Sequence, residues 1–187
     1  YTTLFRSMFW LTNLGMNQSA LAQGAPLPHI FMEAFWTFFI VVGGSGATMG
    51  LVICYLRSRS AHLRSIGRLS VVPSIFNINE PVIFGMPIML NPILAIPFII
   101  TPLVTGSIGY FATAAGFAGK AVVMVPWTTP PLINAWLSTA GSMGAVVTQL
   151  ICILTAVLIY LPFVKIASRR AENAQRQADN AQASENA

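Results

Sequence analysis

The sequence predicts an all-α polytopic membrane protein with about three transmembrane helices and two re-entrant segments. Of the 187 residues, 55% are hydrophobic and only 8% are charged, whereas soluble domains carry about 25% charged residues. The charges also leave long gaps. Residues 34–56 and 121–164 carry none, and residues 69–119 carry one, Glu80. A bilayer crossing needs about 20 apolar residues, so each gap has room for at least one crossing.

The N-terminal residues are not expected to add a regular span. Residues 1–7 (YTTLFRS) read as a translated sequencing or cloning adapter, and we exclude them from the fold prediction. Residues 8–29 begin apolar and then become rich in Asn, Gln, Gly and Pro. This change of composition predicts a broken helix end followed by a loop.

Residues 30–56 are predicted to form the first transmembrane helix. Glycines at positions 43, 44, 46 and 50 would let a second helix approach it closely. Residues 57–68 (RSRSAHLRSIGR) follow as a basic loop or a short amphipathic helix. Because positive charge beside a span favours the cytoplasmic side, we place this segment in the cytoplasm.

Prolines dominate the prediction for residues 69–119. They stand at positions 73, 81, 87, 92, 97 and 102, and a proline inside a helix removes a hydrogen bond. Irregular backbone at membrane depth is tolerated only inside protein or beside a water-filled cavity. We therefore predict a re-entrant hairpin over residues 71–91, with residues 77–81 near its tip, followed by a full crossing over residues 93–117.

The C-terminal part repeats this pattern. Pro126, Pro130 and Pro131 interrupt residues 121–140, which predicts a second re-entrant segment, and residues 144–164 are predicted to form the last helix. Residues 30–165 would then be one membrane unit. Residues 166–187 form a polar tail, predicted to be a frayed helix or a disordered linker. Its basic start after Lys165 places the tail in the cytoplasm.

The sequence predicts no metal site, no cofactor and no nucleic-acid partner. Its basic residues flank apolar stretches and do not form a stripe with interleaved aromatics. Cys54 and Cys152 lie in apolar segments without metal-ligand spacing. A glycine-rich phosphate loop and a Ser/His/Asp order are also missing. A chain of this kind that takes part in phosphorylation depends on a partner for the phosphate.

Glu80, within Asn77-Ile78-Asn79-Glu80-Pro81, is the strongest candidate for function. It is the only acid between Glu33 and Glu172. A carboxylate at membrane depth is costly, so such residues mark substrate or ion paths. The structural alternative is an acid that caps a broken helix. Asn77 and Asn79 favour turns, and their amides also suit sugar hydroxyls.

A second candidate site lies in Val125-Pro126-Trp127-Thr128-Thr129-Pro130-Pro131. The indole of Trp127 offers an apolar face on which a sugar ring can lie. Thr128 and Thr129 supply hydroxyls beside it. The structural alternative is an aromatic belt at the membrane interface, where Trp is common. A Trp between helix-breaking prolines is less typical of such a belt.

Taken in order, these motifs resemble a known family. Its motifs match Pro26-Leu27-Pro28-His29-Ile30, the run Gly43-Gly44-Ser45-Gly46-Ala47-Thr48, Phe76-Asn77-Ile78-Asn79-Glu80-Pro81, and Pro126-Trp127-Thr128-Thr129-Pro130-Pro131. The pattern, over residues 8–165, resembles the membrane permease component, enzyme IIC, of the bacterial phosphotransferase system. The similarity is to the lactose/cellobiose/chitobiose group, and to the C-terminal part of that component.

The resemblance implies a multi-pass inner-membrane homodimer whose C-terminal half binds sugar between re-entrant hairpins. It implies transport of a β-linked disaccharide or oligosaccharide, phosphorylated by a separate cytoplasmic IIB protein that carries phosphate on its own cysteine. The family acid near the phosphorylated hydroxyl corresponds to Glu80, with Asn79 beside it. Glu80 would orient or deprotonate that hydroxyl. The family also has a histidine that would fall upstream of Met8, and no histidine precedes His29 here.

Two other functions fit the residues. In a proton- or sodium-coupled secondary transporter, Glu80 would be the ion site and the sugar would cross unchanged. In a membrane scaffold, the glycines and prolines would serve assembly alone. Dependence of uptake on phosphoenolpyruvate or on an ion gradient separates the first two, and saturable sugar binding argues against the third.

Overall fold

The computed structural model describes residues 2–86 and 88–185, and all regular structure in these residues is helical. Residues 1, 87, 186 and 187 lie outside the described residues, and so does one predicted helix breaker, Pro87. The elements are α1 (Thr2–Ala22), α2 (Glu33–Phe35), the π-helix η1 (Trp36–Ile40), α3 (Met49–Leu56), α4 (Ala61–Ile75), α5 (Glu80–Gly85), the 3₁₀-helix η2 (Ile88–Leu90), α6 (Pro92–Ala114), α7 (Ile133–Ser138) and α8 (Met143–Glu185).

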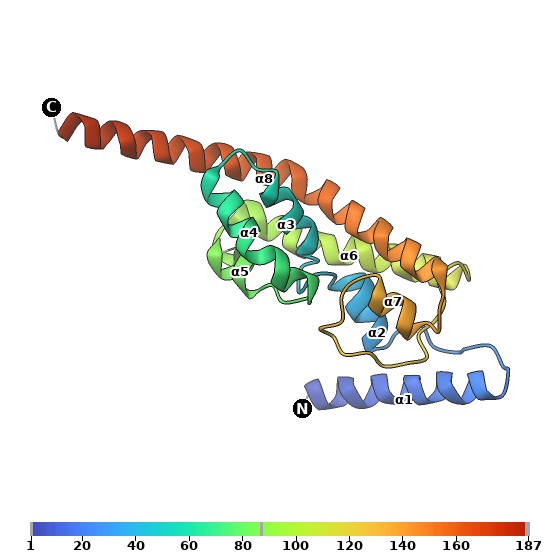
Figure 1. The fold of residues 1–187 in the computed structure, drawn as a ribbon. Helices are drawn as coiled ribbons and strands as arrows, with labels where there is room; N and C mark the ends of the chain where they lie inside the picture. Colours follow the sequence, from blue (N-terminus) through green and yellow to red (C-terminus); the bar gives the residue numbers. More distant parts are fainter. Residues whose placement is uncertain (1, 87, 186–187) are drawn as a thin grey trace.

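Two long helices, α6 and α8, pack against each other and organise the fold (Figure 1). The short helices α3, α4 and α5 gather towards one end of this pair, and α2 and α7 lie towards the other, near α1 (Figure 1). Among the described residues, two helices are long and apolar enough to cross a membrane, Pro92–Ala114 and Met143–Arg170. The helices predicted over residues 93–117 and 144–164 are therefore confirmed. The polar tail continues α8 as helix to Glu185.

Helix α6 stays continuous through Pro97 and Pro102. The hydroxyl of Thr101 donates to the carbonyl of Pro97 at 2.6 Å, and that of Thr105 donates to the carbonyl of Thr101 at 3.1 Å. Small residues at four-residue spacing form its buried face, where an added Cβ at Gly109 would lie 2.5 Å from the ring of Phe39 on η1. Small side chains thus provide the close packing that membrane helices need.

The prediction of one helix over residues 30–56 is wrong. The structure divides this segment into α2 with η1, a turn over residues 41–48, and α3. Gly43, Gly44 and Gly46 have φ values of +76°, +104° and +82°, which L side chains rarely adopt. A glycine inside a helix costs about 1 kcal/mol relative to alanine, so the cluster of glycines favours a break over a span.

The predicted hairpin is confirmed over residues 71–86 of its range. Helix α4 begins at Ala61, so most of the basic segment 57–68 is helical, and it runs on to Ile75. A turn at Phe76–Asn79 leads into α5, which begins at Glu80 with Pro81 in its first turn. Proline at this position costs no helical hydrogen bond, which explains why the chain turns immediately before it.

The second predicted re-entrant segment is mostly irregular. Within residues 121–140, only Ile133–Ser138 (α7) are helical. Leu132 precedes α7, and its backbone N–H donates to the buried side chain of Gln149 on α8 at 2.5 Å. Gln149 also donates to the side chain of Asn134 at 3.0 Å. The buried amide of Gln149 therefore provides a hydrogen-bond partner for a backbone N–H that lies outside any helix.

At the N-terminal end, α1 runs unbroken to Ala22, and the loop begins at the residues rich in Gly and Pro. Residues 8–29, predicted as a broken helix end and a loop, thus contain the last part of α1 and the irregular residues that follow it. Buried Asn17 donates to the carbonyls of His29 and Ala121 at 2.9 and 3.0 Å. This side chain ties α1 to the loop that follows it and to residue 121.

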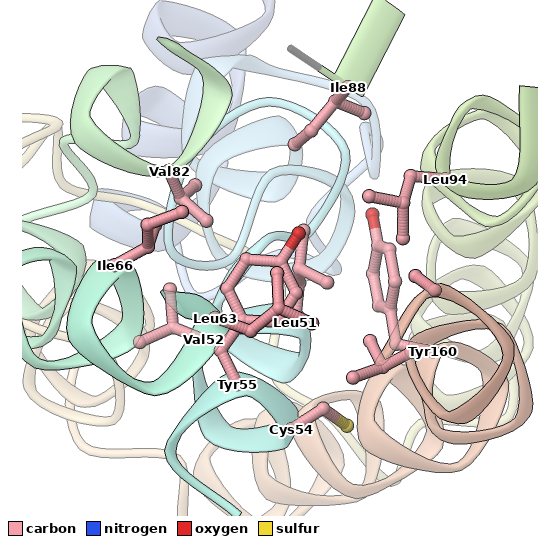
Figure 2. Close-up of a cluster of buried hydrophobic side chains, with 12 residues drawn as sticks. Leu51, Val52, Cys54, Tyr55, Leu63, Ile66, Val82, Ile88, Leu94 and Tyr160 are labelled. Atoms are coloured by element: carbon pink, nitrogen blue, oxygen red, sulfur yellow. The ribbon is translucent and has the colours of Figure 1, made fainter. Parts of the chain in front are cut away.

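The larger apolar core lies at the end of the molecule that contains the hairpin, and it holds the helices of that end together. Figure 2 shows side chains from α3, α4, α5, η2, α6 and α8 converging around Tyr55 and Tyr160. Tyr160 is fully buried, and its hydroxyl donates to the carbonyl of Gly46 at 2.8 Å. The long helix α8 thereby holds the glycine turn in place.

We expect Gly43→Ala to destabilise the protein more than Gly116→Ala does. The two glycines have nearly the same φ, +76° and +78°, but an added Cβ at Gly43 would lie 2.6 Å from the backbone nitrogen of Met49, while nothing lies within 4 Å at Gly116. Both variants lose about 1–2 kcal/mol from the left-handed backbone. Gly43→Ala should lose about 1–3 kcal/mol more from the clash. Thermal unfolding of the full-length protein in detergent measures the difference, and equal losses would contradict this reading of the turn.

Candidate functional site

Three irregular segments meet at one place in the fold. They are the glycine turn (residues 43–48), the hairpin turn (residues 76–79) and the proline-flanked loop (residues 126–130). Their sequence separation is large, yet hydrogen bonds join all three. We call this site the three-loop junction. It contains the two motifs that the sequence predicted to carry function.

Asn77 connects the three segments through its side-chain amide. Its Oδ1 accepts from the backbone N–H of Gly43 at 2.8 Å. Its Nδ2 donates to the carbonyls of Trp127 at 2.6 Å and Thr129 at 3.2 Å. The residue has a φ of +59°, a conformation that Asn adopts more readily than most residues. Asparagine is suited to this position because one side chain supplies an acceptor, two donors and tolerance of the left-handed backbone.

Asn79 makes the second link between the hairpin turn and the glycine turn. Its Nδ2 donates to the carbonyl of Ser45 at 2.8 Å. Gly44 lies against it so closely that an added Cβ would sit 2.5 Å from the Asn79 Cγ. The glycine turn is therefore shaped to receive the hairpin turn, and only a residue without a side chain fits at position 44.

Glu80 and Trp127 differ from the two asparagines in their exposure. Asn77 and Asn79 are 6% and 7% exposed, whereas the side chain of Trp127 is 54% exposed. Glu80 is exposed at the start of α5, and its carboxylate has no hydrogen-bond or ion-pair partner in the described part of the chain. The buried amides thus hold the backbone, while the carboxylate and the indole remain available to a ligand.

The structure connects the two predicted motifs by hydrogen bonds, and it gives the asparagines a different role from Glu80 and Trp127. Asn77 uses both amide hydrogens on backbone carbonyls, and Asn79 gives one to Ser45. Both asparagines therefore position backbone, and their contact with sugar stays a prediction. Thr128 and Thr129 are half-buried beside Trp127, and the Thr129 carbonyl accepts from Asn77.

Sequence reasoning missed the contribution of the glycine turn and of Tyr160. The prediction assigns the four glycines to helix packing, although their density in eight residues is a signal for a turn. Tyr160 gave no such signal, since a tyrosine in an apolar helix is an ordinary core residue. No group of three or more His, Cys, Asp or Glu residues that could hold a metal occurs among the described residues.

Comparison with known proteins shows which family this chain resembles. The family model described as "Phosphotransferase system, EIIC" matches residues 1–102. The lichenan permease IIC component of Bacillus subtilis (strain 168) is 45% identical over 156 residues, which cover 82% of this chain and 34% of that protein. The cellobiose-specific EIIC component of Geobacillus stearothermophilus is 42% identical over 161 residues, covering 84% and 36%.

A solved structure gives the same result for the fold. The crystal structure of ChbC, the IIC component of an N,N'-diacetylchitobiose-specific phosphotransferase system, matches with a TM-score of 0.88 and 41% sequence identity. The match covers 91% of this chain and 40% of ChbC. The chain therefore spans about a third of the length of the two curated relatives, and 40% of the solved one.

We expect Asn77→Asp to destabilise the three-loop junction, with Asn91→Asp as the matched control. The introduced aspartate tolerates the same backbone but places a carboxylate against two carbonyl oxygens, where Asn77 donates. The expected loss is about 1–3 kcal/mol. At the start of α6, Asn91 only accepts, from the N–H of Ile93 at 3.1 Å, and aspartate accepts there equally well. Unfolding of the full-length variants in detergent tests this, and equal stability of the two would refute the role of Asn77.

Proposed function

Because the chain belongs to the EIIC family of the phosphotransferase system, we propose that it is the sugar-binding part of a permease that imports a β-linked disaccharide or oligosaccharide for phosphorylation. The observation that carries the proposal is the three-loop junction, where buried amides hold the turn that precedes the exposed acid Glu80 and the loop that carries the exposed indole of Trp127. The relatives named for lichenan, cellobiose and N,N'-diacetylchitobiose support this substrate class.

The chemistry of Glu80 and Trp127 suits a sugar. A pyranose ring presents an apolar face that stacks on an indole, and a rim of hydroxyls that donate to a carboxylate. Glu80 is the only acid in residues 69–119. A free carboxylate in such an apolar region is costly unless it is hydrated or hydrogen-bonded. Sugar hydroxyls would provide those hydrogen bonds when water leaves the site.

In the proposed reaction, phosphate comes from a separate IIB protein that carries it on a cysteine. The sugar hydroxyl attacks phosphorus, an O–P bond forms, and the S–P bond of the partner's phosphocysteine breaks. The thiolate leaves with the electron pair, and the hydroxyl proton passes to Glu80 or through it to water. Glu80 would thus orient the hydroxyl and receive its proton, while this chain supplies no phosphate-carrying residue.

The two basic segments support the proposed orientation. Ser58, in the loop before α4, and Ser168, on α8, lie with their hydroxyl oxygens 3.0 Å apart. The basic segment 57–68 and the residues after Lys165 therefore occupy the same end of the molecule. By the positive-inside rule, this end faces the cytoplasm, the compartment of the proposed IIB partner. The complete protein is proposed to act as a homodimer in the bacterial inner membrane.

We expect Glu80→Gln to bind cellobiose about tenfold more weakly or worse, because hydrogen bonds to a charged group contribute about 1.5–3 kcal/mol. It should also support little phosphotransfer, since an amide cannot accept the proton. Glu33→Gln is the matched control, because Glu33 is the other acid within the membrane unit and lies outside the junction. Sugar binding and uptake are measured on the full-length protein in vesicles with its IIA and IIB partners.

Wild-type vesicles should accumulate phosphorylated sugar only with phosphoenolpyruvate. Uptake of unchanged sugar driven by a proton or sodium gradient would instead establish the secondary-transport alternative, with Glu80 as its ion site. Wild-type binding and phosphotransfer by Glu80→Gln would reduce Glu80 to a structural acid at the start of α5.

A further inference from the structure

A cavity lies away from the three-loop junction, at the end of the molecule where basic residues follow α3 and lie on α8. Its volume is about 470 Å³. It is enclosed by the end of α3, the loop at residues 57–59 and the face of α8 from Val157 to Glu172. The proposed sugar site makes no use of it. We call it the basic cavity.

The lining of the basic cavity changes from apolar to charged along α8. Four lining residues follow one another at four-residue spacing, namely Val157, Leu161, Lys165 and Arg169. Residues at this spacing share one face of a helix. The membrane-length part of α8 ends at Arg170. Val157 and Leu161 lie well inside it, and Lys165 and Arg169 lie close to its end.

Helix α3 and the loop that follows it show the same change in the same direction. Ile53 lines the apolar end, and Arg57 and Arg59 line the basic end. The side chain of Cys54 lies 3.5 Å from the carbonyl of Val157, and Ser58 contacts Ser168 further along. The two helices therefore run in the same direction across the cavity, and their basic ends coincide.

The charged end of the cavity is strongly positive and firmly built. Four cationic side chains line it (Arg57, Arg59, Lys165 and Arg169), against one acid, Glu172. The hydroxyl of Ser168 reaches Glu172 at 3.3 Å. Ser168 and Ser58 are buried, and both accept from the backbone N–H of Ser60 at 3.3 Å. The four cations are exposed, and none has a hydrogen-bond or ion-pair partner among the described residues, so their charge is not neutralised by a direct partner.

We propose that the basic cavity binds one anionic phospholipid, with the phosphate among the four cations and an acyl chain along the apolar residues of α3 and α8. A small free anion would use only the charged end. An apolar stripe that continues into the membrane-length part of α8 fits a ligand with both a phosphate and a hydrocarbon chain. Basic pockets between helices at the cytoplasmic side are suited to such headgroups.

The test is a lipid titration of the full-length protein in detergent, followed by thermal unfolding. The probes are short-chain phosphatidylglycerol, the matching phosphatidylcholine, and inorganic phosphate. Phosphatidylglycerol should raise the Tm of the wild type, and the other two should not. Arg57→Gln with Arg169→Gln should bind phosphatidylglycerol roughly thirtyfold more weakly, since each basic side chain contributes about 1 kcal/mol.

The matched control is Arg68→Gln with Arg170→Gln. This pair removes the same charge from exposed positions that do not line the cavity, and its affinity should stay near that of the wild type. Leu161→Trp, which fills the apolar end without changing the charge, should also weaken binding. If the first double variant fails to fold, Lys165→Gln alone should still show roughly fivefold weaker binding.

Three results would overturn the proposal. Equal weakening in both double variants would mean diffuse attraction to surface charge. An equal rise in Tm with inorganic phosphate would mean a site for a small anion. Unchanged lipid binding in the first double variant, together with slower phosphotransfer from phosphorylated IIB, would make the cavity a contact for that protein.

Discussion

The side-chain amide of Asn77 holds together the part of this structure that contains both candidate motifs. It joins a glycine turn, a hairpin turn and a proline-flanked loop through three hydrogen bonds. At membrane depth an unpaired backbone group is costly, because no water replaces the missing partner. Three irregular segments can coexist there only if something pairs their backbone groups. Asn77 does so for one N–H and two carbonyls, while Asn79 and Tyr160 pair the carbonyls of Ser45 and Gly46.

This constraint explains the division of labour at the junction. Buried amides are committed to backbone, so they determine where Glu80 and Trp127 lie and leave both free for a ligand. Gly44 allows the hairpin turn to approach within contact distance, while Gly43 lies against Met49 and Gly46 against the ring of Phe98 on α6. The long helices α6 and α8 supply the frame, because the fully buried Tyr160 fixes the glycine turn to α8. Irregular backbone and an uncovered acid are thereby kept in a defined geometry.

The sequence predicted the parts of this fold that depend on composition and on helix breakers. Charge-free length located α6 and α8, and the prolines located the hairpin around Asn77–Pro81. The prediction failed at residues 30–56, because apolar character was given more weight than four glycines in eight residues. It could not place Asn77 against Trp127 and Thr129, about 50 residues away, since periodicity carries no information about contacts between irregular segments. The resemblance to enzyme IIC identified the same motifs but did not distinguish the residues that position from those that are exposed.

The central claim is that the three segments form one sugar site, and hydrogen–deuterium exchange tests it most directly. The full-length protein in lipid nanodiscs is compared with and without cellobiose or N,N'-diacetylchitobiose, and α-linked maltose serves as the control. We predict that the β-linked sugars slow exchange together in residues 43–48, 76–80 and 126–130, while maltose leaves all three unchanged. A cavity of about 660 Å³ lies between η1 and α6, and its lining includes Trp36, Ile99 and Tyr110 as well as Ser45 and Gly46 of the glycine turn. Sugar-dependent protection confined to η1 and α6, with no change in the three segments, would contradict the account.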